Sequence, residues 1–145
     1  MNLPETGRYL ILSVNIYTIF CDDVRQEISG KFILIGVYSG DMNVNNGPAT
    51  VPLSIWIEMT GLSAGHQNLD FVARKQVGLQ RTEIARMHVG IEVNDPKLPV
   101  ALPLQGLGVS IDSDCLVSLY VTCEGEPERL AGTLKVNAVF AEKSN

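Results

Sequence analysis

The sequence contains few of the residues from which catalytic and metal sites are usually built. It has two histidines, His66 and His88, and three cysteines, and none of them pair at the spacing of a zinc site. Its glycines do not have the spacing of a phosphate-binding or dinucleotide-binding loop. We therefore expect a protein that is not an enzyme and binds no cofactor. An enzyme built on Cys21 and one histidine stays open, because a thiol nucleophile needs a nearby base in the folded chain.

Positive charge is scarce as well. The formal net charge is −5, and the eleven lysines and arginines are scattered, with no run longer than Arg74-Lys75. Proteins that bind nucleic acid cluster such residues to neutralise phosphates, so we expect no nucleic-acid partner. No stretch approaches the ~18 apolar residues of a membrane span, so we expect no membrane partner. The first residues lack the basic region and cleavage site of a secretory signal, which predicts a cytoplasmic location.

The cysteines do not form an evident disulfide framework. Cys115 and Cys123 lie eight residues apart in one predicted strand, which corresponds to roughly 26 Å at ~3.3 Å per residue. A disulfide requires Cα atoms within about 7 Å. Because the number of cysteines is also odd, we expect free thiols in a reducing compartment.

The composition is that of an ordinary globular protein. Hydrophobic residues make up 46% of the chain, charged residues 19% and aromatic residues 6%, which predicts an aliphatic core. The 145 residues suit one domain, spanning residues 1–145. A domain of this size buries roughly 68–70% of the surface of its unfolded chain, so it needs no disulfide or metal to fold.

Alternation of apolar and polar residues with a period of two dominates the chain and predicts strands. The expected strands cover residues 9–21, 32–38, 53–59, 69–74, 87–93, 107–111, 117–122 and 133–138, with a proline-containing edge piece at 102–104. Turn residues separate them, including a loop at 39–48. Residues 79–88 fit a short helix as an alternative. About eight short strands predict an all-β protein, a single-domain antiparallel β-sandwich of Ig-like or C2-like type.

The segment 32–38 differs from the other predicted strands because it is apolar on both faces. That pattern is typical of a central strand covered on both sides, or of a strand at the heart of an interface. Ser29-Gly30 is a plausible tight turn, so we expect segment 32–38 to form a hairpin with the strand before it.

A dense cluster of charge lies between these two apolar segments. It consists of Asp22, Asp23, Arg25, Glu27 and Lys31, next to Cys21. The favoured interpretation is a strand end and turn whose charges pair locally. A partner-binding surface stays open, and so does a divalent-cation site. A calcium cage would need further oxygens, for which Asp41, Asp112 and Asp114 are candidates.

Trp56 is predicted on the mixed face of its strand, and Tyr120 on the mixed face of another. Aromatic residues in such positions often anchor interfaces; alternatively, both cover the far side of the sandwich. We expect a protein partner or self-association. The predicted binding residues are Asp22, Asp23, Arg25, Glu27 and Trp56.

The block from Tyr17 to Asp41 contains Phe-Cys-Asp-Asp-Val-Arg at 20–25, Glu27, Gly30-Lys31 and Leu-Ile-Gly-Val-Tyr at 34–38. It resembles the signature of a family of small uncharacterised proteins from bacteria and their phages, and residues 53–56 and 69–71 are similar to that family too. The resemblance implies a compact β-sandwich and carries over no catalytic residues.

Two function hypotheses follow. The first is a non-enzymatic protein-interaction or structural module of bacterial or phage origin, either cytoplasmic or assembled into a virion as an accessory or decoration component. The alternative is a β-sandwich that binds a small ligand or a divalent cation through the carboxylates near Asp22 and Asp23.

Overall fold

The computed structural model describes residues 14–45 and 47–139, and these residues form nine strands and no helix. The strands are β1 (Asn15–Gln26), β2 (Phe32–Val37), β3 (Asp41–Asn45), β4 (Ala49–Thr60), β5 (Gly65–Val77), β6 (Gln80–Val93), β7 (Val100–Ile111), β8 (Cys115–Cys123) and β9 (Arg129–Val139). Since these residues contain no helix, they contain none with the length and apolarity to cross a membrane.

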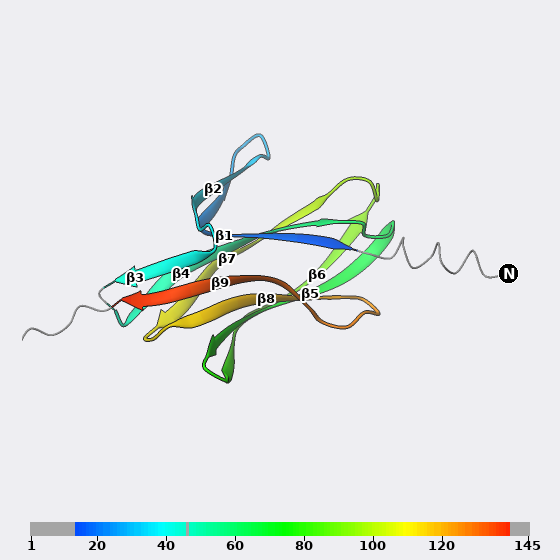
Figure 1. The fold of residues 1–145 in the computed structure, drawn as a ribbon. Coiled ribbons are helices and arrows are strands. Elements are labelled where there is room, and N and C mark those ends of the chain that lie inside the picture. The colour runs from blue at the N-terminus through cyan, green and yellow to red at the C-terminus, as the bar shows by residue number, and fades with distance from the viewer. Residues whose placement is uncertain (1–13, 46, 140–145) are drawn as a thin grey trace, which may run out of the picture.

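The strands form two open sheets that pack face to face (Figure 1). The first sheet has the order β2-β1-β4-β7 and the second has the order β3-β9-β8-β5-β6. The predicted all-β sandwich is therefore confirmed. Its strands are not all antiparallel, however, because β3 pairs with β9 in parallel.

Strand β3 lies where the sequence predicted a loop, and that prediction is wrong. Met42 and Val44 alternate with polar residues and are buried in the core. The asparagines and glycines around them are typical of turns and conceal this short alternation. Because these two side chains are buried between the sheets, segment 41–45 lies beside β9 and pairs with it.

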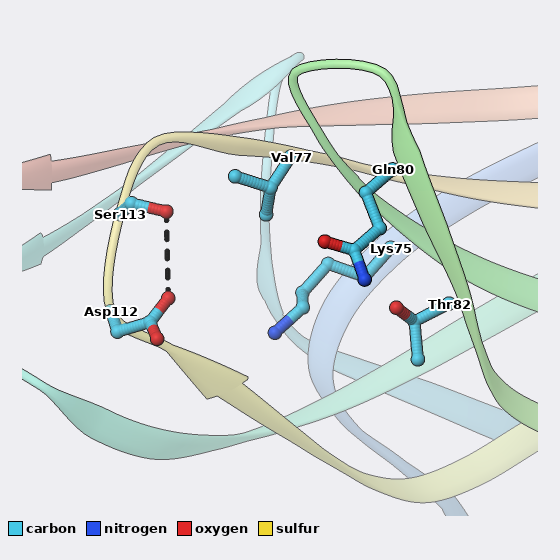
Figure 2. Close-up of a pocket in the computed structure, with 6 residues that line it drawn as sticks. All are labelled: Lys75, Val77, Gln80, Thr82, Asp112 and Ser113. Atoms are coloured by element: carbon cyan, nitrogen blue, oxygen red, sulfur yellow. Dashed lines mark hydrogen bonds between the residues drawn. The ribbon is translucent and has the colours of Figure 1, made fainter.

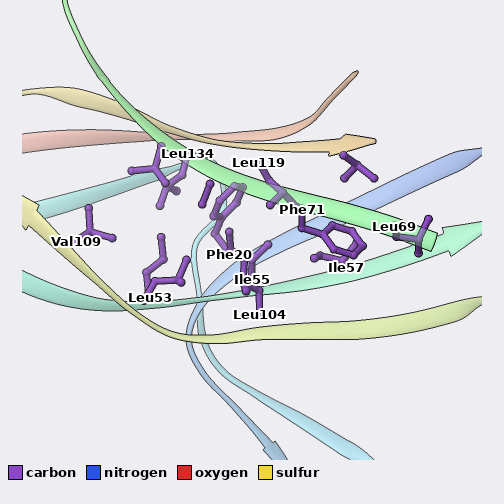
Figure 3. Packing of buried hydrophobic residues seen from close by; sticks show 14 of the residues in the cluster. Phe20, Leu53, Ile55, Ile57, Leu69, Phe71, Leu104, Val109, Leu119 and Leu134 are labelled. Atoms are coloured by element: carbon purple, nitrogen blue, oxygen red, sulfur yellow. The ribbon is translucent and has the colours of Figure 1, made fainter. Parts of the chain in front are cut away.

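The core lies between the two sheets and is mainly aliphatic, as expected (Figure 3). Apart from β2, the strands direct alternate residues into it, because successive side chains of a strand lie on opposite faces. The fully buried members with the largest side chains include Leu53, Ile55, Ile57, Met59, Leu69, Phe71, Ile111, Leu119 and Leu134. Deleting one such aliphatic side chain to alanine typically costs about 2–5 kcal/mol.

Strand β6 includes the polar stretch for which a helix was the alternative, and the helix is ruled out. Its residues pair with β5 from Gln80 opposite Val77 to Val93 opposite Gly65. Gly78 makes the turn with a φ of 59°, a conformation that favours glycine.

Two further expectations about individual residues are confirmed. Pro103 lies in β7, which is the last strand of the first sheet, so its missing amide hydrogen interrupts no sheet interior. Cys21, Cys115 and Cys123 are free and buried.

Strand β2 is an edge strand, so the prediction of a central strand covered on both sides is wrong. Strand β1 pairs with β4 over Asn15 to Cys21 and then with β2 over Cys21 to Gln26. The charge cluster therefore lies largely within a strand and not in a turn. The turn itself is where it was expected: Gly30 has a φ of 91° and its amide donates to the Glu27 carbonyl at 2.9 Å. Residues 9–13 of the first predicted strand lie outside the described residues.

Candidate functional site

The β1–β2 hairpin, residues 21–38, is the candidate site because it holds the charge cluster and the most exposed apolar strand. Figure 1 shows its tip standing away from both sheets. The part of β1 before the hairpin pairs with β4 and also contacts β9 of the facing sheet, where the Thr18 hydroxyl donates to the Ala131 carbonyl at 3.2 Å.

Local pairing, the favoured interpretation of the cluster, holds for Arg25 and Asp23. Arg25 Nε donates to Asp23 Oδ2 at 3.0 Å, and the Val24 amide donates to Asp23 Oδ1 at 2.9 Å. Glu27 accepts a hydrogen bond from the Ser29 hydroxyl at 3.2 Å. The side chains of Arg25 and Asp23 are 71% and 45% exposed. An exposed pair of this kind stabilises a fold by about 1 kcal/mol or less.

Asp22 makes a different contact, which fixes the base of the hairpin. Its carboxylate accepts a hydrogen bond from the Tyr38 hydroxyl and lies directly over Gly36, where any Cβ would collide with it. Burial and the bond to Asp22 raise the pKa of Tyr38 to about 12. Tyr38 therefore remains a neutral hydrogen-bond donor at every physiological pH and holds the Asp22 carboxylate across the two strands.

Asp22 and Lys31 lie near opposite ends of the hairpin. Within the described residues neither belongs to an ion pair, in contrast to Asp23 and Arg25. Glu27 belongs to no ion pair there either, so the hairpin presents two negative groups and one positive group outside the Arg25–Asp23 pair.

One face of the hairpin packs against the sandwich. Val24 is buried, and the Gln105 side-chain amide donates to its carbonyl oxygen. The ring of Phe32 lies against that of Trp56, with centroids 4.9 Å apart and planes inclined by 59°. This contact attaches the hairpin to the outer face of the first sheet.

The other face and the tip of the hairpin are exposed. Ile33, Ile35 and Val37 occupy alternate positions of β2 and are 43%, 40% and 55% exposed, while Ile28 at the tip is fully exposed. The free edge of β2 has no neighbouring strand among the described residues. An apolar edge strand of this kind is a template for pairing with another chain.

The two outer faces of the sandwich differ in polarity. The segments of the first sheet at residues 15–21, 49–60 and 100–111 contain one charged residue, Glu58. The second sheet carries charged and polar contacts on its outer face. Arg74 and Glu128 form an ion pair, and the His66 and His88 imidazoles contact the carboxylates of Glu92 and Asp70. The hairpin extends the sheet with the less charged outer face.

The structure does not bring Cys21 together with a histidine. Cys21 is buried, burial raises the pKa of its thiol, and its Sγ donates to the Asp23 carbonyl at 3.5 Å. His66 and His88 lie on the second sheet, each bonded to a carboxylate. The described residues therefore offer no geometry for a thiol–imidazole pair.

The carboxylates considered for a cation site are dispersed. Asp41 accepts from the Asn137 side chain, Asp112 from the Ser113 hydroxyl and Asp114 from the Ala138 amide. In residues 14–45 and 47–139 no three carboxylate, thiol or imidazole side chains come together as a metal-binding group.

A shallow cavity of about 400 Å³ lies at the end of the sandwich where β5, β6 and the turn after β7 meet (Figure 2). Its charged residues are already engaged within the protein, since Lys75 Nζ donates to the Ser110 carbonyl at 2.7 Å and Asp112 accepts from Ser113. No local sequence pattern indicates this cavity, because its residues come from three separate segments.

Trp56 of β4 is distant in sequence from the hairpin but contacts it through the ring of Phe32. Phe32 was not among the predicted site residues. Tyr120 does not share this surface, because it lies on the second sheet beneath the Arg74 guanidinium, 4.5 Å from the ring centroid. Comparison with protein-family models and with curated proteins found no match. The family resemblance of residues 17–41 therefore stays a prediction.

Proposed function

We propose that the protein is a non-enzymatic interaction module that binds a protein partner through the β1–β2 hairpin. The observation that carries this proposal is the combination of an unpaired edge and exposed isoleucine and valine side chains on β2. A partner strand added to this edge would gain main-chain hydrogen bonds and cover the apolar side chains.

Covering the exposed apolar side chains of β2 would favour binding. Apolar surface removed from water contributes roughly 25 cal/mol per Å². Monomeric proteins usually protect edge strands with charges, prolines or bulges. Strand β2 has no charged residue and no proline from Phe32 to Val37. Such an exposed strand promotes aggregation in an isolated protein, and it stabilises a complex when a partner covers it.

The setting of this interaction is a structural or accessory role in a bacterial or phage assembly, which is the role that the resemblance of residues 17–41 implies. A module of this kind needs a stable folded body and a binding element. The close-packed core stabilises the body, and the hairpin is the binding element.

The test is a capture experiment from cells that express the protein naturally, with three full-length baits. Ile35→Lys places a charge on the exposed face of β2, and the matched control Leu130→Lys changes an exposed apolar residue on the second sheet. We expect a protein, either this chain or another, that binds wild type and Leu130→Lys but is lost with Ile35→Lys. Identical capture by all three baits would contradict the proposal.

A further inference from the structure

We infer that the outer face of the first sheet binds an arginine side chain of a partner protein. The site, called the Trp56 site below, consists of Tyr17 on β1 together with Trp56 and Glu58 on β4. It lies apart from the free edge of β2, so the inference goes beyond the proposed function and does not depend on it.

The strand register places these three side chains on one face. Ile55 and Ile57 on either side of Trp56 are fully buried in the core, so Trp56 and Glu58 point to the outer face. Tyr17 lies directly opposite Glu58 in the pairing of β1 with β4. Such opposite residues are about 4.5–5.5 Å apart, and diagonal neighbours such as Tyr17 and Trp56 roughly 7–8 Å. A planar group fits between two rings at that spacing, because van der Waals contact needs about 3.5–4.0 Å on each side.

The aromatic part of the site is accessible. Tyr17 is 61% exposed and Trp56 is half-buried. Phe32 of the hairpin closes one end of the site, since its ring lies 4.9 Å from that of Trp56 and is inclined to it by 59°. The face of an aromatic ring attracts cations, and the indole of tryptophan does so most strongly.

Glu58 gives the site its charge. It is half-buried, and the neighbouring segments 15–21, 49–60 and 100–111 contain no lysine or arginine. Among the residues that the structure describes, Glu58 forms no ion pair. A carboxylate beside aromatic rings, with no cation of its own chain in these segments, is complementary to a positively charged ligand.

The second sheet shows which cation suits a ring beside a carboxylate. On its outer face the Arg74 guanidinium lies over the Tyr120 ring, 4.5 Å from the centroid, and donates to the two Glu128 carboxylate oxygens at 2.6 and 2.9 Å. A guanidinium can stack and bind both oxygens at once because it is planar, whereas a lysine ammonium group cannot. The Trp56 site presents a ring and a carboxylate without the arginine, and an arginine of the partner completes it.

Tryptophan fluorescence tests the inference, because Trp56 is the only tryptophan of the chain. The probe is N-acetyl-arginine amide, titrated into the full-length protein at constant ionic strength. The controls are N-acetyl-lysine amide and the neutral N-acetyl-citrulline amide. We expect a change that saturates in the millimolar range for the arginine amide, about three- to tenfold weaker binding of the lysine amide, and no change with the citrulline amide. The indole Nε1–H resonance in NMR should shift with the same midpoint.

Variants assign the binding to this face. We expect Glu58→Gln and Tyr17→Leu each to weaken binding of the arginine amide about three- to tenfold. Glu92→Gln, which removes an exposed carboxylate of the second sheet, and Ile35→Lys on β2 should leave it unchanged. Thermal unfolding of each variant checks that it is folded.

Capture from cells that express the protein naturally tests whether the arginine belongs to a protein. We expect a captured protein that the arginine amide displaces and the lysine amide does not, and that Glu58→Gln retains less well than wild type and Glu92→Gln. Capture that is unchanged in Glu58→Gln would contradict a partner protein at this site, even if the free arginine amide binds there.

Three results of the titration overturn the inference: no saturable change with the arginine amide, equal binding of the arginine and lysine amides, or unchanged binding by Glu58→Gln. Capture that is lost with Ile35→Lys but kept with Glu58→Gln refutes this inference and leaves the proposed function standing. Capture that is lost with Glu58→Gln but kept with Ile35→Lys refutes the proposed function and supports the Trp56 site.

Discussion

At the scale of single residues, Gly36 has the most demanding position in the hairpin. Its φ of 66° lies in the left-handed region, and the Asp22 carboxylate occupies the space that a side chain would need. Only glycine lets β2 pass beneath that carboxylate while Tyr38 holds it.

Gly36→Ala is expected to destabilise the protein by more than Gly30→Ala, which also has a positive φ but open space around it. The backbone conformation costs roughly 1–2 kcal/mol in both variants. In Gly36→Ala the Asp22 side chain must also move and loses its bond to Tyr38. Urea unfolding of the two variants measures the difference, and equal losses would mean that the contact with Asp22 has no energetic role.

Asp23→Ala and Arg25→Ala are expected to change the free energy of unfolding by about 1 kcal/mol or less each, because both side chains are largely exposed. The Asp23 variant should be the more costly of the two, since it also loses the bond from the Val24 amide. Thermal unfolding gives the values. A loss of several kcal/mol in either variant would indicate a buried pair and contradict the structure.

At the scale of the elements, the sequence predicted the hairpin but not its place in the sheet. An apolar run and the turn residues before it are local properties, so they identified β2 and the turn at Gly30 correctly. Apolar residues on both faces of β2 indicate that both faces are usually buried. The pattern does not show whether the same chain or a partner buries them. The strand order that leaves β2 at an edge depends on β1 changing partner at Cys21, which no local pattern reveals.

The candidate site was predictable in the same limited sense. Four of the predicted residues lie close together in the sequence, namely Asp22, Asp23, Arg25 and Glu27. Their proximity could therefore be predicted without knowing the fold. The addition of Trp56 through Phe32 depends on how the hairpin inclines over the first sheet, and that arrangement is tertiary.

The β5–β6 pair contains a histidine, His66, whose pKa is raised by its neighbours. The hydrogen bond to Glu92, and to a lesser degree that to Asn68, raises the pKa of His66 above its ordinary value of 6.5. A raised pKa means that protonated His66 stabilises the fold below about pH 6.5, and that this contribution is lost as the pH rises through the folded-state pKa.

We expect the NMR titration of His66 to have a midpoint above 6.5 in the wild type and to move toward 6.5 in Glu92→Gln. The effect on thermal stability between pH 6 and pH 8 should be a small decrease, because the side chain is exposed. An unchanged midpoint in Glu92→Gln would show that the carboxylate does not interact with the imidazole in solution.

At the scale of the whole molecule, the sandwich separates a charged face from an apolar one. The charged and polar side chains of the second sheet keep that face solvated, and in the proposed function the hairpin of the first sheet meets the partner. A rigid core between them lets the hairpin meet a partner in one fixed orientation, which lowers the entropy cost of binding.

Calcium is expected to leave the melting temperature unchanged, because the carboxylates near the hairpin are engaged separately with Tyr38 and Arg25. A cation at a hundred times its dissociation constant would stabilise the fold by about 2.7 kcal/mol, which thermal unfolding detects easily. A clear rise in melting temperature, absent when Asp22 is replaced by Asn, would instead support the cation-binding alternative.

Hydrogen exchange of the β2 amides with and without the captured protein tests the central claim most directly. The account predicts that the β2 amides directed at the free edge exchange rapidly in the isolated protein and become protected in the complex. The Tyr38 amide, which already donates to the Phe20 carbonyl at 2.9 Å, and the amides of β6, the edge strand of the other sheet, should not change. Equal exchange of β2 with and without the captured protein, or new protection confined to another edge, would contradict it.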